Sequence, residues 1–227
     1  NSTSNSWATN GNEVTLSFTA NETLSAVPTV VFLSGGNPIY NSGSSIAYTD
    51  NGSNNYTAKY VAHTNDTDGA VSYTINFTDS AGNNGVEVTS PTNGSSVTYD
   101  ETAPTLSSVY LRANDSNLTR VSAVSSPLVI LSFTSSDPLT TAVVTFLTNG
   151  SSSTAATPTY SNTGNNWSVT YVPQASDTQG VVSYTIDFTN QAGIDGADVT
   201  SGSGNVTFDK TAPTLSNVNI ETNNAAD

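Results

Sequence analysis

The sequence predicts an all-β protein made of two tandem antiparallel β-sandwiches, the first of which lacks its opening strand. Three observations carry this prediction. The chain is rich in Asn, Ser and Thr and only 10% of its 227 residues are charged, which suits solvent-facing strands and turns better than helices. Apolar residues alternate with polar ones in many short segments. These segments recur once, in the same order, roughly 110 residues later.

The second half of the chain repeats the first half. Residues 14–19 recur as 129–134, residues 66–77 as 177–188, and residues 97–106 as 206–215. The order is kept, whereas the offset between copies falls from 115 to 109 because the loops differ in length. Constant order with drifting loop lengths indicates a duplicated domain.

Alternation within each copy predicts strands that bury one face. In the first copy the apolar positions are Val14, Leu16 and Phe18, then Tyr56, Ala58 and Tyr60, then Tyr73, Ile75 and Phe77. In the second copy they are Val129, Leu131 and Phe133, then Trp167, Val169 and Tyr171, then Tyr184, Ile186 and Phe188. A period of two places these side chains on the same face of each strand, toward a core.

Clusters of Gly, Asn, Asp and Ser separate the strands, at residues 34–37, 50–53, 80–83, 148–151 and 163–165. Such clusters form tight turns, and their spacing is typical of an antiparallel sandwich. About seven strands per copy match an immunoglobulin-like domain in size. We therefore expect one such domain over residues 1–100, a second over 101–210, and the start of a further repeat over 211–227.

Two tyrosines are candidates for a tyrosine corner. Tyr73 and Tyr184 each follow a tight corner at the start of a core strand. In a tyrosine corner the hydroxyl group bonds back to the main chain. A plain core tyrosine is the alternative.

Several phrases resemble a known group of domains. Residues 206–218 (VTFDKTAPTLSNV), 14–22 (VTLSFTANE) and 77–83 (FTDSAGN) are similar to the tandem bacterial Ig-like repeats of very long surface and secreted proteins. The resemblance covers nearly the whole chain and implies an Ig-like fold in tandem. Such repeats serve as stalks, spacers or adhesive arms, so the resemblance implies no catalytic residues.

Composition argues against several classes of function. The 18 Asp and Glu residues against 4 Lys and Arg give a net charge of −14, which argues against nucleic acid and anionic lipid as partners. Without cysteine the chain forms no disulfide and has no thiol nucleophile. Its single histidine, His63, corresponds to Pro173 or Gln174 in the second copy, so we expect a solvated loop residue and no enzyme activity.

Comparison of the two copies locates a missing strand. Residues 102–112 precede the first internal strand of the second copy, and the first copy has no counterpart of them. That counterpart stands at the other end of the chain, in residues 211–220. We expect this segment to be a donor strand that completes the first sandwich of the next unit. Its key residues are Thr211, Pro213, Leu215, Val218 and Ile220. Trp7, near the gap, is expected to pack on the incoming strand.

Three interpretations of this gap stay open. Separate subunits can be joined head to tail by donated strands, which gives an open filament unless the rotation closes. The chain can also be a two-repeat window of one long covalent chain, and the absence of an initiator Met fits a processed form or a piece of something longer. A chain boundary displaced by one strand is the third.

Two kinds of polar site are candidates. Asp100 and Glu101 lie at the expected domain junction, where calcium can bind carboxylate oxygens together with corner acids such as Asp66, Asp68 and Asp79. The phrase DETAP is loosely similar to calcium-stiffened cadherin-type linkers, but Lys210 replaces the acid at the second junction. A solvated linker acid is the alternative.

Asn-X-Ser/Thr sequons are frequent in the chain and are candidates for N-glycosylation. The candidate residues are Asn21, Asn51, Asn55, Asn65, Asn76, Asn93, Asn114, Asn117, Asn149, Asn166 and Asn205.

The sequence thus predicts a non-enzymatic structural protein, located outside the cell or at its surface, that is the repeating unit of a stalk or filament. Its expected partners are copies of itself, head to tail. No cofactor other than calcium and no membrane insertion are expected. The alternative is an adhesin-type binding module whose loops recognise carbohydrate or a surface protein.

Overall fold

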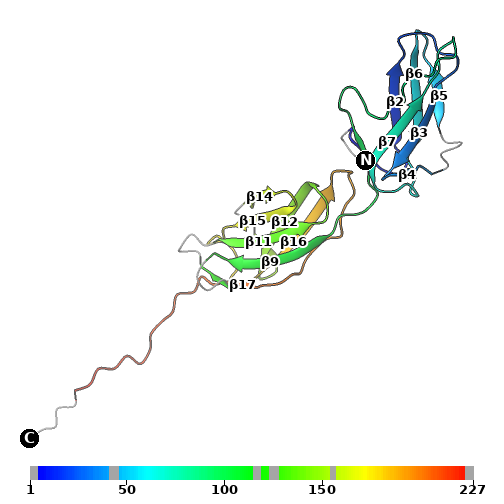
Figure 1. Ribbon diagram of the computed structural model, residues 1–227. Coiled ribbons are helices and arrows are strands. Elements are labelled where there is room, and N and C mark those ends of the chain that lie inside the picture. The colour runs from blue at the N-terminus through cyan, green and yellow to red at the C-terminus, as the bar shows by residue number, and fades with distance from the viewer. Residues whose placement is uncertain (1–4, 41–45, 115–118, 123–127, 154–156, 223–227) are drawn as a thin grey trace, which may run out of the picture. The chain divides into compact units, whose positions relative to one another are not determined.

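The computed structural model describes residues 5–40, 46–114, 119–122, 128–153 and 157–222. These residues form strands and turns, and no helix occurs among them. The strands make four sheets, which pair into two sandwiches (Figure 1). The prediction of an all-β protein with two tandem sandwiches is therefore confirmed.

The first sandwich consists of a five-stranded and a three-stranded sheet. The five-stranded sheet has the order β1 (Trp7–Ala8), β8 (Val97–Tyr99), β7 (Gly69–Asn76), β3 (Thr29–Ser34) and β4 (Asn37–Pro38). The three-stranded sheet has the order β2 (Glu13–Thr19), β6 (Asn55–Val61) and β5 (Ala47–Asp50). Both sheets contribute to one core, which includes Phe32 from β3, Tyr60 from β6 and Ile75 from β7.

The second sandwich consists of a five-stranded and a four-stranded sheet. The five-stranded sheet has the order β10 (Arg120–Val121), β17 (Val206–Phe208), β16 (Gly180–Asn190), β12 (Leu139–Thr148) and β13 (Ser151–Ser152). The four-stranded sheet has the order β14 (Thr159–Thr163), β15 (Asn166–Tyr171), β11 (Val129–Ser135) and β9 (Leu106–Ala113). Leu131, Val169 and Ile186 are fully buried in its core.

Pairing registers repeat between the two sandwiches. Phe18 of β2 lies opposite Tyr56 of β6, with ring centroids 5.8 Å apart, and Phe133 of β11 lies opposite Trp167 of β15, at 6.1 Å. Such cross-strand aromatic pairs stabilise a sheet and fix its register. The prediction that the aromatic residues at positions 56 and 167 belong to the core side of their strands is confirmed.

The opening segments of the two sandwiches differ. In the second sandwich this segment forms two strands: β9 lies beside β11, and β10 pairs in parallel with β17. In the first sandwich β1 pairs in parallel with β8, as β10 does with β17, but no strand in the described part of the chain lies beside β2 on its outer side. The predicted absence of an opening strand therefore concerns the strand that would extend the three-stranded sheet.

The tyrosine-corner prediction is wrong for Tyr184. Its hydroxyl oxygen is buried and has no hydrogen-bond partner, as in a plain core tyrosine. The corner is instead held by a carboxylate, because Asp177 accepts hydrogen bonds from the backbone N–H of Gln174 (2.8 Å) and from the Tyr171 hydroxyl. In the first sandwich Asp66 holds the same corner through the backbone N–H of His63 at 2.9 Å.

Asp177 makes the stability of the second sandwich depend on pH. Burial raises the pKa of this carboxyl, but hydrogen bonds from Gln174, Tyr171 and Ser153 outweigh burial, so the pKa lies below its ordinary value. A depressed pKa stabilises the native state above the unfolded pKa of about 4, and this contribution is lost as the pH falls through the lower native pKa.

We expect Asp177→Asn to lower the free energy of unfolding by about 2 kcal/mol at pH 7, because it removes the charge from three hydrogen bonds. The loss should shrink as the pH is lowered from 7 to 2, because the parent carboxyl is progressively protonated as the pH falls through its native pKa. Urea unfolding of parent and variant at both pH values measures the difference. An equal loss at both would contradict the argument.

Candidate strand-binding interface

The second sandwich shows how an opening strand is held. On one edge β9 lies beside β11 in the four-stranded sheet. On the other edge the backbone N–H of Ser203 donates to the carbonyl of Val109 (2.8 Å), and the N–H of Leu111 donates to the carbonyl of Ser203 (2.9 Å). Thus β9 fills a space between β11 and the segment that leads to β17, and Leu111 is buried there.

The same space is open in the first sandwich. β2, the repeat counterpart of β11, is the outer strand of the three-stranded sheet. Leu131 and Phe133 of β11 are 0% and 2% exposed, whereas their counterparts Leu16 and Phe18 are only partly buried. Because the residues are of the same type in the same register, the difference reflects the missing neighbour.

A groove of about 500 Å³ occupies this space, and we call it the acceptor slot. One wall is formed by residues 15–20, most of which belong to β2, and the other by residues 90–93 and 95. Its floor is apolar and comes from the core-facing side chains of both sheets. The larger apolar side chains that line it are Leu16, Phe18, Leu24, Tyr73, Ile75, Phe77 and Val88.

Glycines in the segments that border this space in the two sandwiches show the contrast directly. At Gly204 of the second sandwich a Cβ atom would lie 2.0 Å from the carbonyl oxygen of Leu111, so only glycine lets this segment approach β9. Gly94 lies in the corresponding segment of the first sandwich and has a similar φ, 72° against 77°. A Cβ atom at Gly94 would meet no atom within 4 Å.

Trp7 has no part in the slot. It belongs to β1, opposite Thr98 of β8, in the five-stranded sheet, and it is not among the residues that line the groove. The expectation that Trp7 packs on an incoming strand is therefore not supported. Trp7 is close to the missing strand in sequence, but it does not line the slot that this strand would fill.

The predicted donor segment is exposed. Residues 211–222, which we call the tail, form no strand (Figure 1). Leu215, Val218 and Ile220 expose 89%, 80% and 95% of their surface. They are the repeat counterparts of Leu106, Val109 and Leu111 in β9. A run of exposed apolar side chains is unfavourable in water and is typical of an interaction segment.

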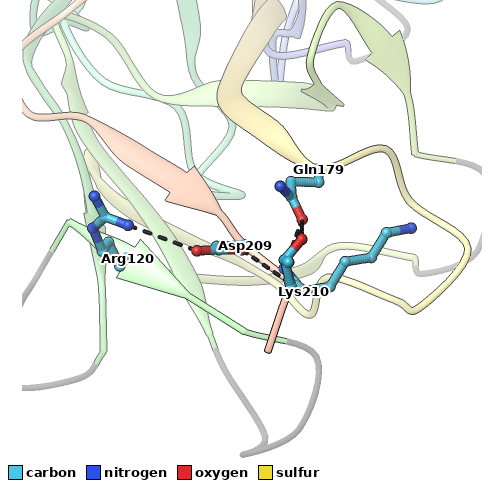
Figure 2. Close-up of polar contacts among 5 residues, drawn as sticks. Arg120, Gln179, Asp209 and Lys210 are labelled. Carbon is cyan, nitrogen blue, oxygen red and sulfur yellow. Dashed lines mark hydrogen bonds and ion pairs between the residues drawn. The ribbon is translucent and has the colours of Figure 1, made fainter. Parts of the chain in front are cut away.

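Polar contacts hold the start of the tail, residues 209–211, against the second sandwich, and we call these residues the root of the tail (Figure 2). The Gln179 side-chain oxygen accepts hydrogen bonds from the backbone N–H of Lys210 (3.2 Å) and from the Thr211 hydroxyl (2.7 Å). The Lys210 ammonium donates to the carbonyl oxygens of Ala175 and Asp177, at 3.0 and 2.9 Å. Arg120 lies 3.7 Å from the preceding carboxylate of Asp209.

The segment before β9 is held at its start in the same way, through residues 101 and 102. There the Asp68 carboxylate accepts hydrogen bonds from the backbone N–H of Glu101 (2.8 Å) and from the Thr102 hydroxyl. Asp68 and Gln179 are repeat counterparts, and both offer an oxygen that accepts hydrogen bonds. This role was not predicted from the sequence; the signal available was an acceptor side chain directly before the corner glycine in both copies.

The proposed calcium residues are engaged in hydrogen bonds. Asp100 is buried, its carboxylate accepts from the backbone N–H of Thr102 (3.1 Å), and burial raises its pKa. Glu101 accepts from the backbone N–H of Asn10 at 2.7 Å. Among the described residues no group of three or more acidic, histidine or cysteine side chains is arranged to hold a metal ion. Calcium at Asp100 and Glu101 stays a prediction.

Asp79, the other corner acid considered for calcium, closes its own turn. Its carboxylate accepts hydrogen bonds from the backbone N–H groups of Ala81 and Asn83, at 2.9 and 2.8 Å. Hydrogen bonds within this turn, the largest from the Asn83 side chain, lower its pKa.

The described glycosylation candidates are exposed, which glycan attachment requires. They are Asn21, Asn51, Asn55, Asn65, Asn76, Asn93, Asn114, Asn149, Asn166 and Asn205. Asn117 lies outside the described residues. Asn93 differs from the others because it lines the acceptor slot. Glycosylation stays a prediction.

His63 lies in the loop after β6, as expected. Its ring stacks on Tyr40, with centroids 4.0 Å apart, and its Nδ1 atom accepts a hydrogen bond from the backbone N–H of Asn65 (3.1 Å). In the part of the chain that the structure describes, no helix is long and apolar enough to span a membrane.

Comparison with known proteins returned solved structures alone. No protein-family model matches the chain, and no curated protein matches it. The titin Ig tandem domains A164-A165 are 14% identical, cover 91% of this chain and 93% of their own, and give a TM-score of 0.29. The titin I-band fragment I67-I69 is 14% identical, with 89% and 61% covered and a TM-score of 0.42.

A third similar structure is the N-terminal Ig1-2 module of the Drosophila receptor protein tyrosine phosphatase DLAR. It is 13% identical, with 92% of this chain and 96% of that module covered, and a TM-score of 0.28. These TM-scores are low, so the fold is established by the paired sheets of each sandwich and not by the matches. The chain has tandem immunoglobulin-like domains. At such identities nothing about partners or activity carries over.

Proposed function

We propose that this chain is a non-enzymatic, extracellular structural protein that assembles head to tail, with the tail of one copy bound in the acceptor slot of the next. The observation that carries the proposal is the position of the slot, which is the position that β9 occupies in the second sandwich. The tail repeats the sequence of β9 and, over its described residues, forms no strand of its own.

The chemistry of the two surfaces is complementary. The slot offers an apolar floor and the outer edge of β2, and the tail offers three exposed apolar side chains on a segment that forms no strand. Burying a Val, Leu or Ile side chain contributes about 1.5 to 3 kcal/mol. An added strand also supplies main-chain hydrogen bonds, as in other cases of strand addition.

Slot and tail are different surfaces, so their contact is heterologous. Repeating a heterologous contact gives an open polymer unless its rotation closes a ring. In the second sandwich β9 fills the corresponding space, so that sandwich offers no equivalent slot. Each copy thus binds one neighbour through its slot and another through its tail. The net charge of −14 per chain keeps neighbouring polymers apart.

Two valine substitutions test the proposal on the full-length chain. Val218→Asp places a charge on the tail and should abolish the polymers seen by size-exclusion chromatography and electron microscopy. Val86→Asp is the matched control, since Val86 is 86% exposed but does not line the slot. Neither residue is buried, so both variants should fold. Polymers of unchanged length with Val218→Asp would refute the proposal.

A second measurement separates donated strands from a longer covalent chain. After boiling in SDS, separate subunits should run near 23.4 kDa plus any glycan. A species of hundreds of kDa would mean that the slot is filled by the preceding repeat of the same chain, and would replace head-to-tail assembly of subunits. Deleting residues 213–227, which leaves the root contacts of Lys210 and Thr211 in place, should abolish assembly.

A further inference from the structure

We propose that Asn217 fixes the register of the donated strand: a left-handed kink at this residue directs Val218 and Ile220 into the slot, with Val218 opposite Phe18 and Ile220 opposite Leu16. This inference rests on the proposed function and goes beyond it, because it states which residues meet and what selects them.

The first observation is a bulge in β9. The backbone N–H of Asn114 donates to the carbonyl of Leu128 (3.0 Å), and that of Ser136 donates to the carbonyl of Thr105 (2.9 Å). Between these two hydrogen bonds β9 advances nine residues, from 105 to 114, whereas β11 advances eight, from 128 to 136. The extra residue is accommodated where Ser108 has a φ of 52°. One strand with an added residue in the left-handed region defines a β-bulge.

The bulge decides which side chains share a face. Leu106 and Val109 are an odd number of residues apart, so a regular strand would turn them to opposite faces. With the bulge between them, both are partly buried, and Leu111 after them is fully buried. Leu215, Val218 and Ile220 have the same spacing in the tail, so they need the same kink to face one slot together.

The second observation is that the tail already has this kink. Asn217, the repeat counterpart of Ser108, has a φ of 54°, although the tail forms no strand. Asparagine adopts the left-handed region more readily than most residues, and more readily than the serine of β9. The tail is therefore shaped for the bulged geometry before it meets a partner, which lowers the entropic cost of binding.

The register follows from the repeats. Counting along both strands from the Asn114–Leu128 hydrogen bond places Leu111 opposite Leu131 and Tyr110 opposite Ser132. The Ser132 hydroxyl donates to the Tyr110 carbonyl at 3.5 Å, which agrees with this count. The counterparts of Leu131 and Ser132 are Leu16 and Ser17 in β2. The counterparts of Leu111 and Tyr110 are Ile220 and Asn219 in the tail. An antiparallel tail thus places Ile220 over Leu16 and Asn219 beside Ser17, on the outer face.

Engineered cysteine pairs test this register, and the chain has no native cysteine to interfere. In Ser17→Cys/Asn219→Cys the two Cα atoms should lie about 5.5 Å apart across the interface, within the range for a disulfide. Oxidised polymers should then give an SDS ladder of covalent multimers. The matched control, Ser17→Cys/Glu221→Cys, moves the second cysteine two residues along the same face and should give monomer.

Each outcome decides something different. A ladder from Ser17→Cys/Glu221→Cys, with none from Ser17→Cys/Asn219→Cys, would overturn the register and leave the proposed function standing. Polymers that give neither ladder would show that the tail does not lie along β2. If the parent chain forms no polymers at all, the proposed function fails and the register with it.

Substitutions at Asn217 test the kink itself. Asn217→Gly tolerates a positive φ and should assemble like the parent, whereas Asn217→Val opposes it and should weaken association about tenfold or more. Equal assembly of the two variants would refute a role for the kink. Because the residue is exposed and outside both sandwiches, the melting temperature of the isolated chain should not change.

Discussion

A synthetic peptide of residues 211–222 should raise the melting temperature of the assembly-deficient chain by about 10 °C or more. The acceptor would be the full-length chain with Val218→Asp and Ile220→Asp, whose slot is intact and whose tail is disabled. A ligand that binds only the native state stabilises it by about 2.7 kcal/mol at a hundredfold excess over its Kd. In a domain of roughly 100 residues each kcal/mol raises the melting temperature by about 4 to 8 °C.

Differential scanning calorimetry measures this effect and also locates it. The transition of the first sandwich should move, and that of the second, whose corresponding space is filled by β9, should not. A peptide with Val218→Asp and Ile220→Asp is the control and should shift neither transition. An unchanged first transition at millimolar peptide would argue against binding in the slot.

Gly94→Asn should reduce assembly by about 5- to 150-fold without unfolding the chain. A Cβ atom at Gly94 points into open space, and asparagine tolerates its φ of 72°. Once a strand fills the slot, the added side chain would clash with that strand, as a Cβ at Gly204 would clash with Leu111. Overpacking of this kind costs about 1 to 3 kcal/mol, which converts to the stated loss.

Gly52→Asn is the matched control for this substitution. Gly52 has a φ of 76° and also faces open space, but it lies in the turn between β5 and β6, whereas Gly94 lies between the slot-lining residues Asn93 and Ser95. Sedimentation velocity of both variants should show polymers for Gly52→Asn and monomers for Gly94→Asn. Equal loss in both would mean that strain at a positive φ, and not the slot, is responsible.

Much of the fold could be predicted because its signals are local and repeated. Alternation at Leu131 and Phe133 indicated the buried face of a strand, and the copy at Leu16 and Phe18 showed that the domain occurs twice. The lack of an opening strand could be inferred because the first copy can be aligned with the second, which has this strand. The structure added where that strand belongs, which depends on pairing that no single segment encodes.

Other features depended on partners distant in sequence. Tyr184 had the position of a tyrosine corner, but whether its hydroxyl finds a carbonyl is a matter of tertiary packing, and Asp177 holds that corner instead. The roles of Asp68 before β9 and of Gln179 at the root of the tail depend on residues more than 30 positions away. The left-handed kink occurs at an asparagine and not at a glycine, so the alternation of apolar and polar residues could not predict its position.

The two-sided fixation of β9 has a mechanical consequence. A pull along the axis of this strand loads its hydrogen bonds to β11 and to the Ser203 segment at the same moment, since these bonds run across the strand. Bonds loaded together in shear resist far more force than bonds opened one after another from an end. In the proposed assembly, a donated tail held on both sides in this way would let chains that are joined only by noncovalent contacts carry tension.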